Sequence, residues 1–288
     1  MSEDTTCRSR EEEAEAFLRR WPPAIPLLTL LTAAGLYAGV GACLRLHQAG
    51  AWWMVVPAGL LVHAYMIVIV HDGAHRAITR TGADSGLMNL GAGLVLLPFY
   101  GELFRRYHLM HHAHTNEGVD PLWPPFKKRL YVEHRRLYML AELVPFAFTA
   151  LVLASGRPRD APDRVPGPRV RPTYLLFSLA VAALTAWWVR PAPMFVVLTL
   201  LSANAWGEVR HWCEHVGFDA QKESNTYRFP LGMGIGNHAA HHEHPGYSWI
   251  SMAVGLHHRP KDTGPLRTVW RMLRCPGYQP YAVLRRDP

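Results

Sequence analysis

The chain has 288 residues, of which 49% are hydrophobic and only 18% are charged. Soluble domains usually contain about 25% charged residues, so this composition argues against a simple cytosolic globule. It also excludes an intrinsically disordered chain, which would be poor in apolar residues. Four widely spaced cysteines, none in a CxxC pair, exclude a disulfide-rich secreted scaffold, and we expect all four to be reduced thiols.

Charged residues are absent from two long stretches near the N-terminus. No Asp, Glu, Lys or Arg occurs from Trp21 to Leu44 or from Gln48 to Val70. A helix needs about 20 apolar residues to cross the hydrocarbon core of a bilayer. Together with two later apolar stretches, these segments predict an all-α membrane protein with about four spanning helices. The predicted spans are residues 24–44, 50–70, 172–189 and 191–207.

Two further apolar segments, 86–101 and 137–155, are expected to lie in the membrane interface. The first contains four glycines, and the second has basic residues on both flanks. Because short cytoplasmic loops carry the excess of Lys and Arg, both flanks of the second segment are expected in the cytoplasm. The pattern predicts a multi-pass integral membrane protein with both termini cytoplasmic. Its net charge of +8 then gathers on the cytoplasmic side, where it can contact anionic lipid.

This topology divides the chain into three parts. We expect a cytoplasmic N-terminal segment at 1–22, a membrane domain at 23–255 and a cytoplasmic tail at 256–288. The Arg- and Pro-rich run 157–172 is interpreted as a loop within the membrane domain. No nucleic-acid-binding motif accompanies the basic residues, so nucleic acid is not an expected partner.

Histidine is the residue type that points to function, because ten of the 17 histidines fall into four short windows. Two windows follow the pattern HxxxH and two follow HxxHH. Spacings of three and four place side chains on one helical face. Under the predicted topology, all four windows lie at the cytoplasmic membrane surface. They contribute His71, His75, His108, His111, His112, His211, His215, His238, His241 and His242.

These imidazoles predict a metal centre. Imidazole nitrogen is a good ligand for zinc, copper, iron and nickel. Ten ligands exceed the coordination of one ion, so we expect two ions. Neutral imidazoles leave such a site strongly cationic, and carboxylates that orient the rings are expected nearby. The candidates are Asp72, Glu214 and Glu243, within or next to the windows, and Asp120, which follows the second window.

The remaining histidines are expected to play other roles. His114 and His244 sit beside two of the windows and are expected to be spectators or to support the ligands, rather than to bind metal. His63, inside the second predicted span, is expected to be a core residue, and a position along a substrate channel is the alternative. Surface or interface positions are expected for His47, His134, His257 and His258.

At these residues the sequence resembles the integral-membrane fatty acid desaturase and hydroxylase superfamily. That family carries three histidine boxes, HxxxH or HxxxxH, HxxHH and HxxHH or QxxHH, on one membrane face, and a further histidine after the last span. Here the boxes are His71–His75, His108–His112 and His238–His242, with His215 as the further histidine. The resemblance covers about residues 50–255, most of the chain.

The surroundings of the boxes are similar to the family as well. The second box is followed by Asn116 and by Asp120-Pro121, and the run Glu214-His215-Val-Gly217 resembles the family's EHxG segment. By the same resemblance, Asn116 and Asn237 join the residues expected to support the ligands. Acyl-CoA desaturases of the family carry Asn where His211 stands, so His211 is expected to be a tenth direct ligand, as in other branches.

The resemblance implies a four-span fold with a cytoplasmic cap that carries the boxes and the active site. It implies two iron ions that use O2, with two electrons from an external ferredoxin- or cytochrome-type donor. The implied reaction inserts a double bond into an acyl chain. The chain would be carried by a lipid, coenzyme A or an acyl-carrier protein, so the expected partners are the bilayer, this substrate and an electron-transfer protein.

Three alternatives stay open. Within the same superfamily, the enzyme would be a hydroxylase or ketolase of an alkyl chain or a carotenoid. The EHxG segment and the run Asn225-Thr226-Tyr227-Arg228, which also resembles the desaturases, favour desaturation. A His-rich metal transporter would place its ionisable groups near the bilayer midplane, whereas these windows lie beyond the span ends. A metal-free membrane scaffold would keep the same iron content when His111 or His241 is replaced by Ala.

Overall fold

The structure is a computed structural model, and six ranges of the chain are described here. They are residues 23–117, 120–144, 167–215, 224–229, 231–255 and 264–275. Within these ranges the fold is all-helical, with one isolated bridge between Thr226 and Asn237 in place of a sheet. The predicted segment 1–22 and most of the tail 256–288 lie outside the described residues, as do His257 and His258.

The first predicted span is helix α2, Ala24–Gln48. It continues four residues further than the predicted span 24–44, and its last turn contains Arg45 and His47. Basic side chains interact favourably with the partial negative charge at a helix C-terminus. The helix is followed by Gly50 at φ 102°, a conformation that glycine adopts readily because it has no Cβ.

The second predicted span is a continuous helical run from Trp52 to Ala74. It consists of η1 (Trp52–Met54), α3 (Val55–Tyr65), η2 (Met66–His71) and α4 (Asp72–Ala74). The segment η2 is π-helical, which turns the residues after it relative to an uninterrupted α-helix. Single π-helical turns are frequent at functional sites, and this one ends at His71, the first histidine of the first window.

The third predicted span coincides with α9, Pro172–Val189, and the fourth forms the first part of α10, Pro193–His215. By length and apolar composition, three helices among the described residues could cross a membrane: α2, the run Trp52–Ala74, and α9. The last two turns of α10 carry Glu208, Arg210 and Glu214, which lower its overall apolarity. A crossing by the first part of α10 therefore stays a prediction.

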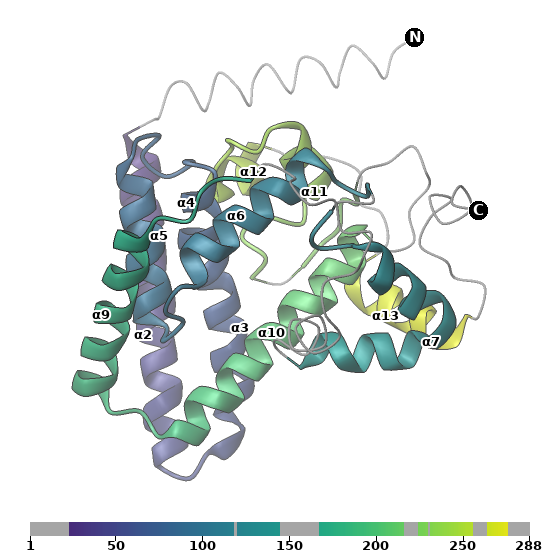
Figure 1. Cartoon of the computed structure of the whole chain (residues 1–288). Coiled ribbons are helices and arrows are strands. Elements are labelled where there is room, and N and C mark those ends of the chain that lie inside the picture. The colour runs from purple at the N-terminus through teal and green to yellow at the C-terminus, as the bar shows by residue number, and fades with distance from the viewer. Residues whose placement is uncertain are drawn as a thin grey trace.

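The segment 86–101, expected to be one interfacial stretch, is divided between two helices. They are α5, Ala83–Leu94, and α6, Tyr100–Ala113. The turn between them places Leu96 and Phe99 at positive φ, 60° and 73°. Helix α5 lies along α9 (Figure 1), and Gly93 permits the contact, since a Cβ there would lie 2.7 Å from Val181 Cβ. The reversal of direction returns the chain toward the second histidine window.

Four further helices, α7, α11, α12 and α13, build the histidine end of the described structure. Helix α7, Pro125–Leu143, contains the start of the predicted segment 137–155, and the rest of that segment lies outside the described residues. Helix α13, Pro265–Arg274, packs with α7 beside α10 (Figure 1). The short helices α11, His238–Glu243, and α12, Trp249–Gly255, lie near α4 and α6 in Figure 1.

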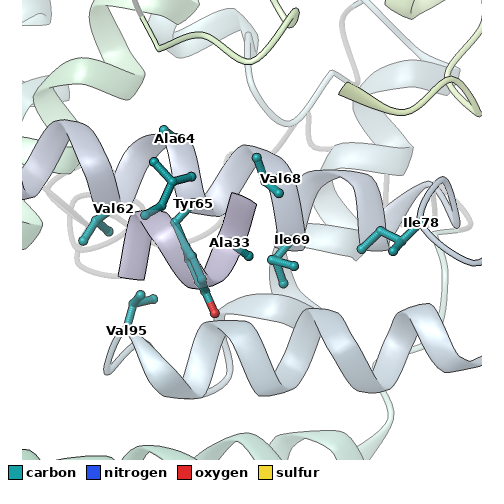
Figure 2. Close-up of a cluster of buried hydrophobic side chains, with 9 residues drawn as sticks. Ala33, Val62, Ala64, Tyr65, Val68, Ile69, Ile78 and Val95 are labelled. Carbon is teal, nitrogen blue, oxygen red and sulfur yellow. The ribbon is translucent and has the colours of Figure 1, made fainter. Parts of the chain in front are cut away.

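The membrane part of the core forms where α2, the run Trp52–Ala74 and the end of α5 meet. Val62, Tyr65, Ile69 and Val95 belong to this cluster, and the ring of Tyr65 reaches toward α5 (Figure 2). Helices α3 and α10 cross closely because Gly59 leaves no side chain between them, and a Cβ there would overlap the side chain of Ser202. Small residues allow such close approach between helices in membranes. The crossing fixes the relative positions of the histidine-bearing ends of the two helices.

Candidate metal centre

Four helix ends deliver the histidine windows to one place. His71 and His75 stand at the end of the second helical run, and the second window occupies the last two turns of α6. His215 is the last residue of α10, and His238 is the first residue of α11. The structure thus joins windows that lie up to 170 residues apart, since the imidazoles of His71 and His241 approach to 3.0 Å.

The first group of imidazoles comprises His71, His75, His108 and His241. Each offers one ring nitrogen, and these four atoms lie within 4.8 Å of one another. His112 lies against the same group, with its Nε2 2.9 Å from Nε2 of His241 and 3.2 Å from Nε2 of His108. Among the described residues, Nε2 of His75 is buried and has no hydrogen-bond partner.

The second group comprises His111, His215, His238 and His242, whose donor atoms also lie within 4.8 Å of one another. The Nε2 atom of His215 is 3.2 Å from that of His111 and 3.0 Å from that of His238. The Nε2 atom of His242 is in turn 3.2 Å from that of His238. His112 stacks on His242 with ring centroids 4.3 Å apart, so it stands between the two groups.

This convergence of ring nitrogens fits bound cations better than hydrogen bonding. An imidazole nitrogen carries either one proton or one in-plane lone pair, so Nε2 of His215 cannot form good hydrogen bonds to both of its neighbours. Metal-bound imidazole nitrogens lie roughly 2.0–2.1 Å from an ion such as zinc, which places adjacent ligand atoms about 3 Å apart. The spacings within each group match that arrangement. The residues therefore fit a pair of metal ions.

Burial keeps the rings in the form that binds metal. Removal from water disfavours the charged imidazolium, and it lowers the pKa of His75 and of His242 to about 3. Burial and the neighbouring histidines lower the pKa of His112 further still. These imidazoles are neutral at pH 7, and a neutral ring is the form that coordinates a metal ion.

His211 lies at the edge of the second group. Together with Glu214 and His215 it forms a third set of donor atoms within 4.8 Å of one another. Its Nε2 atom is buried and has no hydrogen-bond partner among the described residues. The ring centroids of His211 and His215 are 5.6 Å apart. A position as an additional ligand of the second group is compatible with this arrangement.

Two aspartates orient one ring in each group. Asp72 Oδ1 lies 3.2 Å from Nδ1 of His71, while its Oδ2 accepts a hydrogen bond of 2.7 Å from the backbone N–H of Trp249. Asp120 lies 2.9 Å and 3.0 Å from Nδ1 of His111 through its two oxygens. A carboxylate on Nδ1 holds the proton there and directs the Nε2 lone pair toward the ion.

Asp120 is itself held firmly. Its oxygens accept backbone hydrogen bonds of 2.9 Å from both Asn116 and Leu122. Burial alone would raise the pKa of the Asp120 carboxyl, but the hydrogen bonds from His111 and from the two backbone N–H groups lower it overall. Asp120 is therefore a carboxylate at pH 7, able to stabilise a proton on Nδ1 of His111. Asn116 contributes here through its backbone.

Glu214 joins several buried side chains by hydrogen bonds. The sequence predicted Glu214 itself as a supporting residue, but not its partners. Its Oε1 accepts hydrogen bonds of 2.6 Å from Arg210 and 2.6 Å from the hydroxyl of Tyr227, and its Oε2 lies 3.5 Å from Nε2 of His238. Neither Arg210 nor Tyr227 was among the predicted site residues. The i,i+4 spacing of Arg210 and Glu214 on α10 was a usable signal, whereas nothing local linked Tyr227 to Glu214.

Thr115 is a second residue that sequence analysis missed. Its hydroxyl donates to the carbonyl oxygen of His111 at 2.7 Å, and its oxygen lies 3.2 Å from Nδ1 of His242. Because the hydroxyl proton is donated to the carbonyl group, the oxygen is available to accept a hydrogen bond from the Nδ1–H of His242. Thr115 thus acts on the second HxxHH window as a carboxylate acts on the others. Its position inside the run after the second box was the available clue.

The other predicted supporting residues lie further out. Asn237 is buried and donates to the carbonyl oxygen of Met252 at 2.8 Å, which ties α11 to α12. Glu243 is exposed at the end of α11. His114 forms a partly exposed pair with Glu117 at 2.8 Å, and His244 stacks on Tyr247. Neither His114 nor His244 belongs to a donor group found among the described residues.

His63 is buried in α3, as expected of a core residue. Its ring meets Phe229 edge-on, with centroids 6.0 Å apart, and it faces Gly207 of α10. The described part of the chain therefore places His63 within the α3–α10 contact, one π-helical segment away from His71.

Comparison with known families identifies the chain. The sequence model of a family described as "Fatty acid desaturase" matches residues 50–252. The chain belongs to the fatty acid desaturase family. The matched region contains all ten histidines of the four windows, so the resemblance drawn from the boxes is confirmed. No individual curated protein matches the chain. Membership of the family, with the three apolar helices, makes the protein a membrane oxidoreductase of the desaturase type.

Proposed function

We propose that the protein is an O2-dependent diiron desaturase that introduces a double bond into an acyl chain. The observation that carries the proposal is the pair of buried imidazole groups, each with four ring nitrogens within 4.8 Å of one another. Two iron ions bound there would supply the O2 activation needed to break unactivated C–H bonds, which no ordinary side chain can do. Family membership supports the choice of this chemistry over metal transport or a scaffold role.

The chain's own residues would hold and orient this centre. His71, His75, His108, His112 and His241 would bind one ion, and His111, His211, His215, His238 and His242 would bind the other. Asp72, Asp120 and Thr115 would keep protons on the Nδ1 atoms of His71, His111 and His242. Glu214, paired with Arg210, would fix the end of α10 beside the second ion.

Overall, two hydrogens leave neighbouring carbons of the chain, and O2 is reduced to two waters with two further electrons and two protons. The two electrons would come from an external ferredoxin- or cytochrome-type protein. The acyl chain would be carried by a lipid, coenzyme A or an acyl-carrier protein. The apolar helices support a substrate that partitions into the bilayer.

The proposal includes a topology. Helix α10 would provide a fourth crossing over residues 191–207, the histidine end would face the cytoplasm, and both termini would lie on that side. Five Lys and Arg residues of α7, at the histidine end, and further arginines in the sequence between α7 and α9 support this orientation. The membrane domain would extend over residues 23–255, with cytoplasmic segments before and after it.

The test is the mass of the product. The purified protein, loaded anaerobically with iron, is given O2, a reducing ferredoxin system and a panel of acyl lipids and carotenoids. Loss of two hydrogens from an acyl substrate is the expected result. Gain of one oxygen would instead assign the hydroxylase or ketolase reaction of the same superfamily. A protein that binds no iron would contradict the proposal altogether.

A further inference from the structure

A cavity lies at the end of the helical bundle remote from the histidines. Thr29 marks the histidine end of α2, because its hydroxyl accepts a hydrogen bond of 3.1 Å from Nε1 of Trp249, whose backbone N–H contacts Asp72. The cavity is lined by Arg45 and Gln48, which stand at the opposite end of the same helix. It has a volume of about 410 Å³ and lies between α2, α3, α9 and α10. Pockets that hold small ligands usually measure about 300–1,000 Å³.

The walls of this cavity are mostly apolar. Val62 and Val95, both labelled in Figure 2, contribute from α3 and from the turn after α5. Leu200 and Phe195 contribute from α10, and Trp188 closes the side formed by α9. Such a surface fits a hydrocarbon chain, because apolar side chains offer contact without requiring hydrogen bonds.

Several polar groups interrupt the apolar wall, among them a buried hydroxyl and a guanidinium at the rim. Thr199 is only 4% exposed, and its hydroxyl oxygen has no hydrogen-bond partner among the described residues although it belongs to the cavity lining. A buried hydroxyl without a partner costs free energy, so this group suits an acceptor on a ligand. At the rim, Arg45 supplies a guanidinium, and Arg190 directly follows the lining residue Val189.

Thr199 and the rim residue Arg45 lie at different depths in the cavity. Phe195 packs against His47 near the C-terminal end of α2, with ring centroids 5.1 Å apart. Thr199 is four residues further along α10, which is about 6 Å along the helix axis. A ligand that reaches both places therefore carries an anionic group at the rim and an oxygen acceptor about one helical turn deeper. A phospholipid has this order of groups, with its phosphate outside its ester oxygens and its chains innermost.

The attachment of α9 also points to a ligand in the cavity. Helix α9 packs on α5 through the contact at Gly93, but its outer face is largely exposed, with Leu184 at 64% and Trp187 at 63%. The cavity separates the C-terminal half of α9 from α2 and α10. A chain that filled this space would join α9 to the rest of the bundle by van der Waals contact.

We propose that this cavity binds one phospholipid from the adjacent membrane leaflet. The phosphate contacts Arg45, an ester oxygen accepts a hydrogen bond from Thr199, and an acyl chain extends between α3 and α10. This lipid is a structural ligand, bound at the opposite end of the bundle from the histidine groups. The site is independent of the desaturase proposal, since it uses none of the histidines.

The test compares two glycines of α2 at which a Cβ would meet no atom within 4 Å, Gly41 in the cavity lining and Gly35 outside it. The full chain is purified in detergent, delipidated and incubated with phosphatidylglycerol, and bound lipid is counted by native mass spectrometry. The Gly41→Leu variant should lose one bound lipid because its side chain fills the cavity. The Gly35→Leu variant should keep that lipid. Equal binding by both variants would overturn the proposal.

A second measurement examines the phosphate contact. The variant Arg45→Gln changes an exposed side chain and should fold even if Gly41→Leu does not. It should bind phosphatidylglycerol about tenfold more weakly, as expected for loss of a charge-assisted hydrogen bond. Diacylglycerol, which has no phosphate, should bind the unaltered protein more weakly by a similar factor. Binding of diacylglycerol as tight as that of phosphatidylglycerol would contradict recognition of the phosphate.

Discussion

The two ends of the helical bundle are built by different means. At the histidine end, several carboxylates are between 0% and 1% exposed and accept two or more hydrogen bonds each, among them Asp72, Glu102, Asp120 and Glu214. At the opposite end, the contacts between α2, α3 and α10 are made by an apolar cluster that includes Leu44, Val55 and Phe195. That end also contains the cavity.

This difference suits one end to metal binding and the other to binding of a flexible apolar chain. Hydrogen bonds are directional, so a ring that is bonded at Nδ1 and packed on both faces has one orientation, as a metal ligand requires. Apolar contacts are not directional, and a surface built from them accepts a flexible chain without a fixed geometry. We therefore expect substitutions at the histidine end to change metal binding, and substitutions at the far end to change lipid binding and stability.

The largest expected effect is loss of a histidine from one group. His241→Ala removes a donor from the first group and His242→Ala removes one from the second. Each variant should lower bound iron from about two ions to about one, and turnover should fall by more than the roughly 100-fold seen when supporting residues are lost. Iron is counted by elemental mass spectrometry. His134→Ala, at an exposed position in α7, should leave both values unchanged.

A smaller loss is expected when the ligand stays and its orienting carboxylate is removed. Asp120→Asn replaces a carboxylate that accepts from Nδ1 of His111 and from two backbone N–H groups. Iron affinity and turnover should fall by about 10- to 100-fold. The matched control is Glu117→Gln, because Glu117 pairs with His114 outside the two groups. Equal effects of the two substitutions would show that Asp120 does not orient a ligand.

The crossing of α3 and α10 links the two ends, and Gly59 tests it. Gly59→Ala would force a Cβ into the side chain of Ser202. Overpacking of this kind costs about 1–3 kcal/mol of folding free energy. Gly35→Ala, where a Cβ would meet nothing within 4 Å, is the control. Denaturant unfolding in detergent measures the difference. Equal stability of the two variants would mean that the helices do not approach closely at Gly59.

The smallest expected effect comes from an ion pair that joins the histidine end to α9. The buried side chain of Glu102 accepts hydrogen bonds of 2.7 Å from Arg171 and 3.1 Å from Arg105. Because the Arg171 side chain is 36% exposed, water weakens the pair, and we expect Glu102→Gln to lower stability by only about 1–2 kcal/mol. Iron content should stay the same. A variant that lost iron would show that Glu102 supports the metal centre directly.

The histidine end could largely be predicted from the sequence, and the far end could not. The spacing in HxxxH and HxxHH places side chains on one face of a helix, so the ten histidines could be named from the sequence. Asp72 and Asp120 could be named as well, because they lie in or close after these windows. Local sequence did not pair the residues that act across the fold with their partners. Tyr227 reaches Glu214 only because the described segment 224–229 lies beside the end of α10, and Thr115 acts on His242, 127 residues away.

Helix boundaries were predicted less well than helix existence, for identifiable reasons. The span prediction ended at charged residues, yet α2 and α10 continue past Arg45 and Glu208, because charged side chains oppose burial in hydrocarbon and do not oppose helix formation. The π-helical turn at Met66–His71 lies in an uninterrupted apolar run, where no residue marks it. The division of the segment 86–101 depends on positive φ at Leu96 and Phe99, which hydropathy does not report.

The central claim is that the two imidazole groups bind two iron ions. The most direct test is anaerobic titration of the metal-depleted protein with Fe(II), followed by removal of loosely bound metal and elemental mass spectrometry. We expect saturation at two ions per chain, and one ion fewer in both His241→Ala and His242→Ala. Saturation below one ion per chain, or an unchanged iron content in both variants, would contradict it.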